Sequence, residues 1–235
     1  MDFPVTICNR KFYKERFTLV LLGAWTQMVL SIGERIKGFL FSPSDTFDAS
    51  KEDTIGDALK YFVVILAIFA VIFAVLIAVL FSLFSGMLGM SGIPMMALGA
   101  AMGPLLAVGA FICVLVGGII GVFIDGLWLH IWVYLVGGRN GVGQTIKALM
   151  YGSTPSCLLG WLPVVNTIAL IWALIVGTIG VRQLHELPTG KAVLAVIIAI
   201  AIPLIIYVAI LSAFIATMPG PMFPGPKGGP GFGGF

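Results

Sequence analysis

The sequence predicts an all-α integral membrane protein with five transmembrane helices, the N-terminus in the cytoplasm and the C-terminus outside. Composition is the first reason: of 235 residues, 60% are hydrophobic and only 10% are charged, whereas a soluble domain carries about 25% charged residues. Apolar surface on that scale needs lipid as its solvent. The second reason is a series of long apolar runs, and the third is where Lys and Arg fall between them.

The positions of Lys and Arg orient the crossings, because cytoplasmic segments retain these residues. With the N-terminus inside, Lys227 is the only Lys or Arg in an outer segment. The inner segments hold the others: Arg10, Lys11, Lys14, Arg16, Arg35, Lys37, Lys51, Lys60, Arg139, Lys147, Arg182 and Lys191. An even number of crossings would break this pattern. A re-entrant hairpin formed by the third and fourth runs would leave both termini on the same sides, so that alternative stays open.

Residues 1–57 are expected to form a cytoplasmic N-terminal region with an amphipathic helix. The apolar positions of this helix recur at helical spacing and are Val29, Ile32, Ile36, Phe39 and Leu40. Its polar side holds Glu34, Arg35 and Lys37. This pattern is typical of a helix in the membrane interface, and a helix packed on the bundle fits it equally well. Pro43 then turns the chain. Met28, where the organised pattern begins, is an alternative start of the protein.

Residues 58–217 are expected to form the transmembrane domain, with a disordered Pro/Gly-rich outer tail over 218–235. The expected crossings run from Tyr61 to Phe84, Leu105 to Ile124, Thr145 to Trp161, Val164 to Val181 and Ala192 to Thr217. An uncharged outer segment, Gly86 to Pro104, joins the first two. The third run is the weakest, because it spans only about 25 Å and contains Lys147 and Pro155.

An aromatic cluster and a glycine-rich loop follow the second run. The cluster consists of Trp128, His130, Trp132 and Tyr134, and such rings favour the headgroup level of a membrane. The loop is Gly137 to Gly143, and Gly138 to Thr145 nearly fits a phosphate-binding loop. That motif needs a Lys where this chain has Gln144, so the sequence favours coincidence in a glycine-rich turn.

Asp125 is the only acid within an apolar helical stretch. Gly109, Cys113, Gly117 and Gly121 share its helix face at steps of four residues. Small residues at that spacing let helices approach closely, so we expect this stripe to pack helices within one chain or between copies. Pairing with a nearby cation or backbone group is the favoured interpretation of Asp125. A proton or ion pathway is the alternative, because intramembrane acids often serve one.

Nothing in the sequence predicts an enzyme, a cofactor or a nucleic-acid partner. Methionine thioethers can hold Cu(I), but no outer His or Cys supports a copper site, so flexible apolar filling is favoured. The methionines concerned are Met87, Met90, Met95, Met96 and Met102. Cys8, Cys113 and Cys157 lack metal-ligand spacing. The net charge of +3 is spread over separate loops, which argues against a nucleic-acid surface.

Several short motifs, in order, resemble the Yip family of multi-pass membrane proteins. They are Ile36–Pro43 with Thr46-Phe47, Ala58–Tyr61, Leu135–Arg139, Gln144-Thr145 with Tyr151–Pro155, and Gly180–His185 through Lys191-Ala192. The resemblance implies five membrane helices, a cytoplasmic N-terminal region and no enzymatic activity. The Tyr and Pro of the family's third-helix motif match Tyr151 and Pro155. Gly138 and Arg139 belong to the matched motif after the second crossing.

The resemblance also implies a partner, because eukaryotic Yip proteins interact with Rab (Ypt) GTPases in vesicle transport and membrane organisation at the endoplasmic reticulum and Golgi. The eukaryotic motif Asp-Leu-Tyr-Gly-Pro is absent from Thr54–Tyr61, so the chain is more similar to the prokaryotic branch, in the cell membrane. The leading expectation is a non-enzymatic scaffold for membrane organisation that docks a cytoplasmic partner. The alternative is a small proton- or ion-coupled transporter that uses Asp125. Homo-oligomers remain open.

Overall fold

The computed structural model describes residues 32–90 and 96–217. These ranges contain helices and turns but no strand, which confirms the all-α prediction. The described helices are α2 (Ile32–Phe41), α3 (Pro43–Ala49), α4 (Ile55–Met90), α5 (Met96–Leu135), α6 (Val142–Gly152), α7 (Thr154–Leu159), α8 (Pro163–His185) and α9 (Thr189–Thr217). They belong to two units, Met1–Val196 and Ile197–Phe235, and α9 contributes to both. The predicted tail over 218–235 and the helix start at Val29 lie outside the described residues.

Four of the described helices are long and apolar enough to cross a membrane, rather than the expected five. They are Ile55–Met87, Met102–Leu135, Pro163–His185 and Thr189–Thr217. These helices contain the first, second, fourth and fifth predicted runs. The predicted third run is instead divided between α6 and α7.

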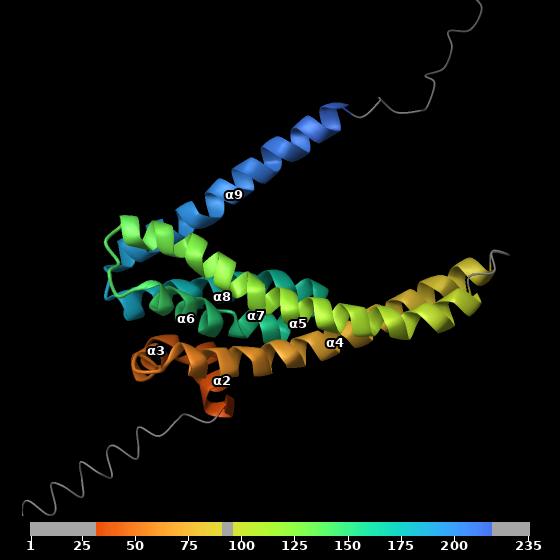
Figure 1. Cartoon of the computed structure of the whole chain (residues 1–235), viewed down its shortest axis with the longest axis horizontal. Helices are drawn as coiled ribbons and strands as arrows, with labels where there is room; N and C mark the ends of the chain where they lie inside the picture. Colours follow the sequence, from red (N-terminus) through yellow and green to blue (C-terminus); the bar gives the residue numbers. More distant parts are fainter. Residues whose placement is uncertain (1–31, 91–95, 218–235) are drawn as a thin grey trace, which may run out of the picture. The chain divides into compact units, whose positions relative to one another are not determined.

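Helices α4 and α5 form an antiparallel pair and lie side by side along their length (Figure 1). The register is set by two close contacts, Gly118 against Leu66 and Gly103 against Ser82. The prediction that Gly86 to Pro104 forms an outer loop is wrong for the described residues, because α4 continues to Met90 and α5 begins at Met96. The physical reason is that backbone groups in lipid must be hydrogen-bonded within their own segment, so Gly- and Met-rich sequence stays helical there.

The break between α6 and α7 follows from Pro155. Proline lacks an N–H and its ring clashes with the carbonyl four residues earlier, here that of Tyr151. The helix therefore stops at Gly152, and Pro155 lies in the first turn of α7, where its N–H is not needed. Side chains satisfy the carbonyls left at the break: Ser153 Oγ donates to Met150 O at 2.9 Å and Thr154 Oγ1 donates to Tyr151 O at 2.6 Å.

Within the first unit, the N-terminal helices α2 and α3 pack on α7 and α8. The Phe47 ring lies against Gly180 of α8, and Trp172 Nε1 of α8 donates to Leu40 O at 3.2 Å. The sequence placed Arg35 on the polar, outward side of its helix, and that placement is wrong. Arg35 and Phe39 are the buried residues of α2. The cause is a partner for the guanidinium inside the unit, which amphipathic spacing cannot reveal.

Helices α4, α5, α6, α8 and α9 meet at one end of the first unit, which we call the loop end. Thr145 at the start of α6 bonds His130 near the end of α5 and His185 at the end of α8. Lys147 Nζ donates to the carbonyls of Lys51 and Asp53 just before α4. A Cβ on Gly137 would lie 3.8 Å from Lys191 Nζ, which brings the start of α9 to the same place. The basic loops predicted to share one side of the membrane therefore lie together.

Candidate functional site

A buried polar cluster links the N-terminal region to α6 at the loop end, and we call it the Asp53 cluster: Arg35, Asp53, Lys147 and Tyr151. The Arg35 guanidinium pairs with both carboxylate oxygens of Asp53 and donates to Tyr151 Oη at 2.9 Å. The Tyr151 hydroxyl in turn donates to Asp53. Lys147 Nζ holds the same loop through the carbonyls of Lys51 and Asp53 at 2.9 and 2.8 Å. Residues far apart in the sequence are thus joined by charge-assisted hydrogen bonds.

The electrostatics of the Asp53 cluster favour the ionised pair. Burial alone would raise the pKa of Asp53, but hydrogen bonds from Arg35 and Tyr151, with attraction to Arg35 and Lys147, hold that pKa below its ordinary value. Burial alone would lower the pKa of Arg35, and the hydrogen bond to Asp53 and the nearby Tyr151 and Asp53 raise it instead. The carboxylate is therefore fully engaged inside the protein, which makes it a poor candidate for chemistry on a substrate.

Aromatic rings pack around the Asp53 cluster. Phe39 stacks on Tyr151 with ring centroids 4.7 Å apart, and Phe47 meets Phe39 edge to face at 4.9 Å. Tyr61 of α4 also contacts both Phe39 and Tyr151. Because Thr154 donates to Tyr151 O, the Tyr61 hydroxyl is the donor in its 3.0 Å bond to Thr154 Oγ1. Tyr151, the matched family-motif residue, thus lies at the centre of the packing, fully buried.

A second polar group joins α5, α6 and α8: His130, Thr145 and His185. Thr145 Oγ1 lies 2.8 Å from His130 Nδ1 and 2.9 Å from His185 Nε2. A threonine hydroxyl has one proton to donate, so it donates to one imidazole and accepts from the other. Thr145 is fully buried. The near match to a phosphate-binding loop therefore ends in a residue that is already bonded on both sides.

Gly138 and Arg139 lie in the loop that leads into α6. A Cβ on Gly138 would lie 2.5 Å from Val133 Cγ1 and 3.1 Å from His185 Nδ1, so a larger residue does not fit. The Gly138 N–H donates to Val133 O at 2.8 Å. The Arg139 guanidinium lies 3.7 Å from the centroid of the Tyr134 ring, which is a cation–π contact. Both matched positions therefore shape the loop, and the Arg139 charge remains at the surface.

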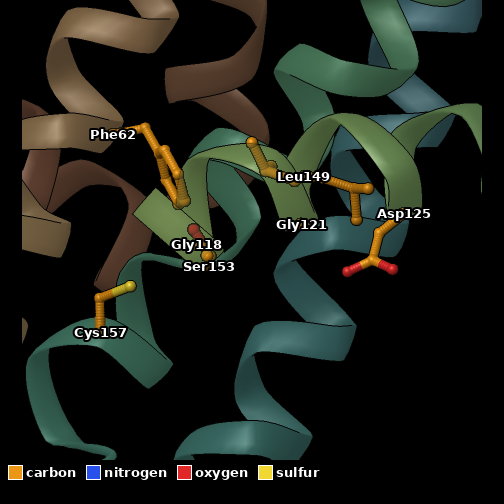
Figure 2. Close-up of a pocket in the computed structure, with 9 residues that line it drawn as sticks. Phe62, Gly118, Gly121, Asp125, Leu149, Ser153 and Cys157 are labelled. Carbon is orange, nitrogen blue, oxygen red and sulfur yellow. The ribbon is translucent and has the colours of Figure 1, made fainter. Parts of the chain in front are cut away.

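Asp125 lies elsewhere, at a pocket on the side of the first unit that we call the Asp125 groove. Figure 2 shows its carboxyl group at one end of the labelled residues and Cys157 at the other. The groove has a volume of about 370 Å³. Its lining consists of Phe62, Gly117, Gly118, Gly121, Val122, Asp125, Leu149, Ser153 and Cys157. Ser153 comes from the matched motif Tyr151–Pro155, but Tyr151, Pro155, Gly138 and Arg139 themselves are not part of this lining.

The glycines of α5 divide into two groups. Gly118 and Gly126 carry the packing inside the chain, because a Cβ would lie 2.8 Å from Leu66 or 2.6 Å from Ile146. Gly109, Gly117 and Gly121, which the sequence singled out for helix packing, have nothing within 4 Å of a Cβ in the part of the chain that the structure describes. Their predicted role therefore stays open for a helix or lipid from outside the chain.

Residues 37–211 match the family model of the Yip1 domain. The chain belongs to the Yip family. With its apolar helices, this Yip protein is a multi-pass membrane protein that lies in a lipid bilayer. No curated protein and no solved structure matches the chain. The family match covers α3 to α8, the second half of α2 and the greater part of α9. The Asp125 groove therefore lies within the Yip1 domain, as do Asp53, Lys147 and Tyr151, whereas Arg35 precedes the matched residues.

Sequence reasoning missed Asp53, Arg35 and the pairing of the two histidines. The available signal was Lys147, a cation within an apolar run, which needs a partner when buried. Its partners are backbone carbonyls, which carry no sequence signature. Arg35 lies on the polar side of the amphipathic pattern and Asp53 has polar neighbours, so neither sequence context indicates a buried partner. Only the fold brings them to Tyr151.

Proposed function

We propose that this Yip-family protein is a non-enzymatic scaffold for membrane organisation, which docks a cytoplasmic partner at the loop end. The observation that carries the proposal is the Asp53 cluster, which fixes the N-terminal region on the bundle through buried ionic bonds. A docking surface gains from being held rigid before its partner arrives, because less ordering entropy is lost on binding. Lys37, Arg139 and Lys191 are exposed basic residues of the same unit.

The engagement of the polar side chains supports a role without catalysis. Asp53 is occupied by Arg35 and Tyr151, and Thr145 is occupied by both histidines. Catalytic acids and bases need access to a substrate proton, and these groups are turned inward. The described residues hold no cluster of three or more His, Cys, Asp or Glu side chains that could bind a metal.

We further propose that the loop end faces the cytoplasm and that the chain crosses the membrane an odd number of times. Retention of Lys and Arg on the cytoplasmic side supports this orientation. The bond between Thr145 and His185 supports it too, because it joins the start of α6 to the end of α8. These two ends therefore lie on the same side of the membrane. The chain leaves the loop end through α6 and α7 and returns to it through α8, which packs beside them. Helices α6 and α7 are then either a broken third crossing or one arm of a re-entrant hairpin. Either arrangement leaves residues 218–235 outside.

Site-specific photocrosslinking in native membranes tests the docking proposal. A photoreactive residue at exposed Lys37 or Lys191 should capture a discrete protein. The matched control is Val164, 85% exposed at the opposite end of α8, which should give lipid adducts only. A captured small GTPase would extend the Rab-type partnership of eukaryotic relatives to this chain. Identical lipid adducts at all three positions would contradict docking.

A reporter fused to Phe235 tests the orientation independently. Reporter activity outside the cytoplasm is expected, with a second reporter in the loop at Asn140 active inside. Cytoplasmic activity at both positions would overturn the odd number of crossings without affecting the docking result.

A second function, proton- or ion-coupled transport, is favoured by one observation: the Asp125 carboxyl group opens into a groove of about 370 Å³. In proteoliposomes a transporter should lose flux when Asp125→Asn removes the charge. Glu186→Gln, an exposed acid in the loop after α8, is the control. Flux that depends on Asp125 alone would replace the scaffold proposal.

A further inference from the structure

One end of the Asp125 groove lies where the apolar runs of α4 and α5 end. The register that packs Gly118 on Leu66 and Gly103 on Ser82 brings Asp125 to about the level of Lys60. That residue is the last charge before the apolar run of α4. On α5 the apolar run Leu105 to Ile124 ends just before Asp125 and covers about 30 Å, the thickness of a hydrocarbon core. Both helices therefore place the carboxylate at the boundary between acyl chains and headgroups.

From that boundary the groove runs into the hydrocarbon layer. Gly121 and Gly117 lie one and two turns below Asp125, about 6 and 12 Å deeper. A Cβ at either glycine would meet nothing within 4 Å, so the floor is open. Phe62, Val122 and Leu149 provide apolar walls. The Asp125 groove is therefore apolar along its length and charged at one end, and its volume is within the range of small-molecule sites.

The Asp125 carboxylate has no ion pair or hydrogen bond with any side chain that the structure describes. Lys60, the cation at its level, is already paired with Asp57 at 3.3 Å. A carboxylate at this boundary attracts a positive group more strongly than it would in bulk water, because the local dielectric constant is lower. A cation from outside the chain would complete the site.

A second copy of the chain is a poor occupant. Two parallel α5 helices crossing on the Gly117-x-x-x-Gly121 face would bring their Asp125 carboxylates toward each other. Like charges at such a contact disfavour it. A lipid with a positive headgroup meets no such repulsion.

We propose that the Asp125 groove binds a phospholipid with an ammonium headgroup, taken from the leaflet at the loop end. The ammonium donates hydrogen bonds to the Asp125 carboxylate, and one acyl chain lies over Gly121 and Gly117 against Phe62 and Leu149. This binding mode follows from the order of residues on one face of α5, where the charged Asp125 is followed by the open positions Gly121 and Gly117. This site would tie the scaffold to one lipid class, independently of any protein partner.

Native mass spectrometry of the purified full chain tests this proposal with two probes that share their acyl chains. Phosphatidylethanolamine carries the ammonium, and its N-acetyl derivative keeps the phosphate but loses the positive charge. We expect phosphatidylethanolamine to be retained about tenfold more strongly, as for one charge-assisted hydrogen bond. Equal retention of the two lipids would overturn the proposal.

Variants of the groove separate charge from shape. Asp125→Asn should lower phosphatidylethanolamine retention to that of the N-acetyl lipid, and unchanged retention would overturn the proposal. Gly117→Leu and Gly121→Leu place a side chain over the floor, where a Cβ meets nothing within 4 Å, and should also lower retention. Gly109→Leu, on the same open face but outside the groove, is the matched control and should retain lipid. If the floor variants instead abolish a dimer with lipid retention unchanged, the occupant is a second copy and the lipid proposal fails. If Asp125→Asn does not fold, the glycine variants decide.

Discussion

The Asp53 cluster and the Asp125 groove contain one carboxylate each, and the two carboxylates have opposite environments. Asp53 is bonded to Arg35 and Tyr151 and enclosed by aromatic rings. Asp125 is exposed, opens into a groove and has no partner among the described side chains. An acid in a membrane protein therefore indicates function through its pairing, and its mere presence in an apolar segment is not enough. A paired acid stabilises the fold, whereas an unpaired one is available to a ligand.

The same contrast holds for the backbone around each carboxylate. Near the Asp53 cluster, Gly152 packs against the backbone of α8, with a Cβ position only 2.7 Å from Gly177 Cα. In the Asp125 groove, Gly117 and Gly121 meet nothing. One region is closed by helix contact and the other is left open, and four substitutions test this difference.

The largest effect is expected from Arg35→Met. It leaves the half-buried Asp53 carboxylate without its cation, and breaking a buried pair by removing one partner costs about 3 kcal/mol. Lys60→Met is the control, because its pair with Asp57 is exposed and contributes less than about 1 kcal/mol. Unfolding in detergent, followed by tryptophan fluorescence, measures both. Equal losses would mean that the Asp53 cluster is no more important than a surface pair.

Next in size is Gly152→Ala, which we expect to destabilise by about 2 kcal/mol because the methyl group forces α6 from α8. Gly117→Ala should be neutral or slightly stabilising, since alanine favours the helix and the Cβ meets open space. Thermal unfolding midpoints of the two variants give the comparison directly. A loss at Gly117 as large as that at Gly152 would show that the groove is closed in the membrane.

Thr145→Val should cost about 1.5 kcal/mol, because it removes the hydroxyl that bonds both His130 and His185 and leaves buried imidazole nitrogens unsatisfied. Thr178→Val is the matched control: its hydroxyl bonds the carbonyl of Leu174 within the same helix and is exposed. Urea unfolding of both variants measures the difference. Indistinguishable midpoints would remove Thr145 as the link between α5, α6 and α8.

The smallest effect concerns acid stability. The folded pKa of Asp53 lies below its ordinary value of about 3.9. Its contribution is therefore complete above that ordinary value and is lost as the pH falls through the lower, folded pKa. Asp53→Asn should flatten this acid limb in an unfolding series between about pH 5 and pH 2. An acid limb as steep in Asp53→Asn as in the unsubstituted protein would contradict this prediction.

Much of the architecture could be predicted from the sequence, and the failures have physical causes. Apolar runs gave α4, α5, α8 and α9, because only a helix satisfies its own backbone in lipid. The break at Pro155 was visible as a weak third run, but its division into α6 and α7 depends on the side chains of Ser153 and Thr154. The extent of α5 was underestimated because Gly and Pro104 read as loop residues in water.

For the sites, Tyr151, Gly138 and Arg139 could be named from motifs, and Asp125 from its isolation. What they contact could not. Gly117 and Gly121 were singled out while Gly118 and Gly126 do the packing inside the chain. Spacing alone cannot tell which face of a glycine-rich helix meets a neighbour.

Composition and the order of apolar and charged residues are enough to predict that the chain is helical, lies in lipid and has its cations in a few shared loops. These properties depend on composition and on the cost of unsatisfied backbone in hydrocarbon, which any arrangement of the helices must respect. The tertiary structure alone decided that Arg35, Asp53 and Tyr151 meet while Asp125 stays open. Pairing of charges depends on which helix faces touch, and that is set by packing between residues about a hundred positions apart.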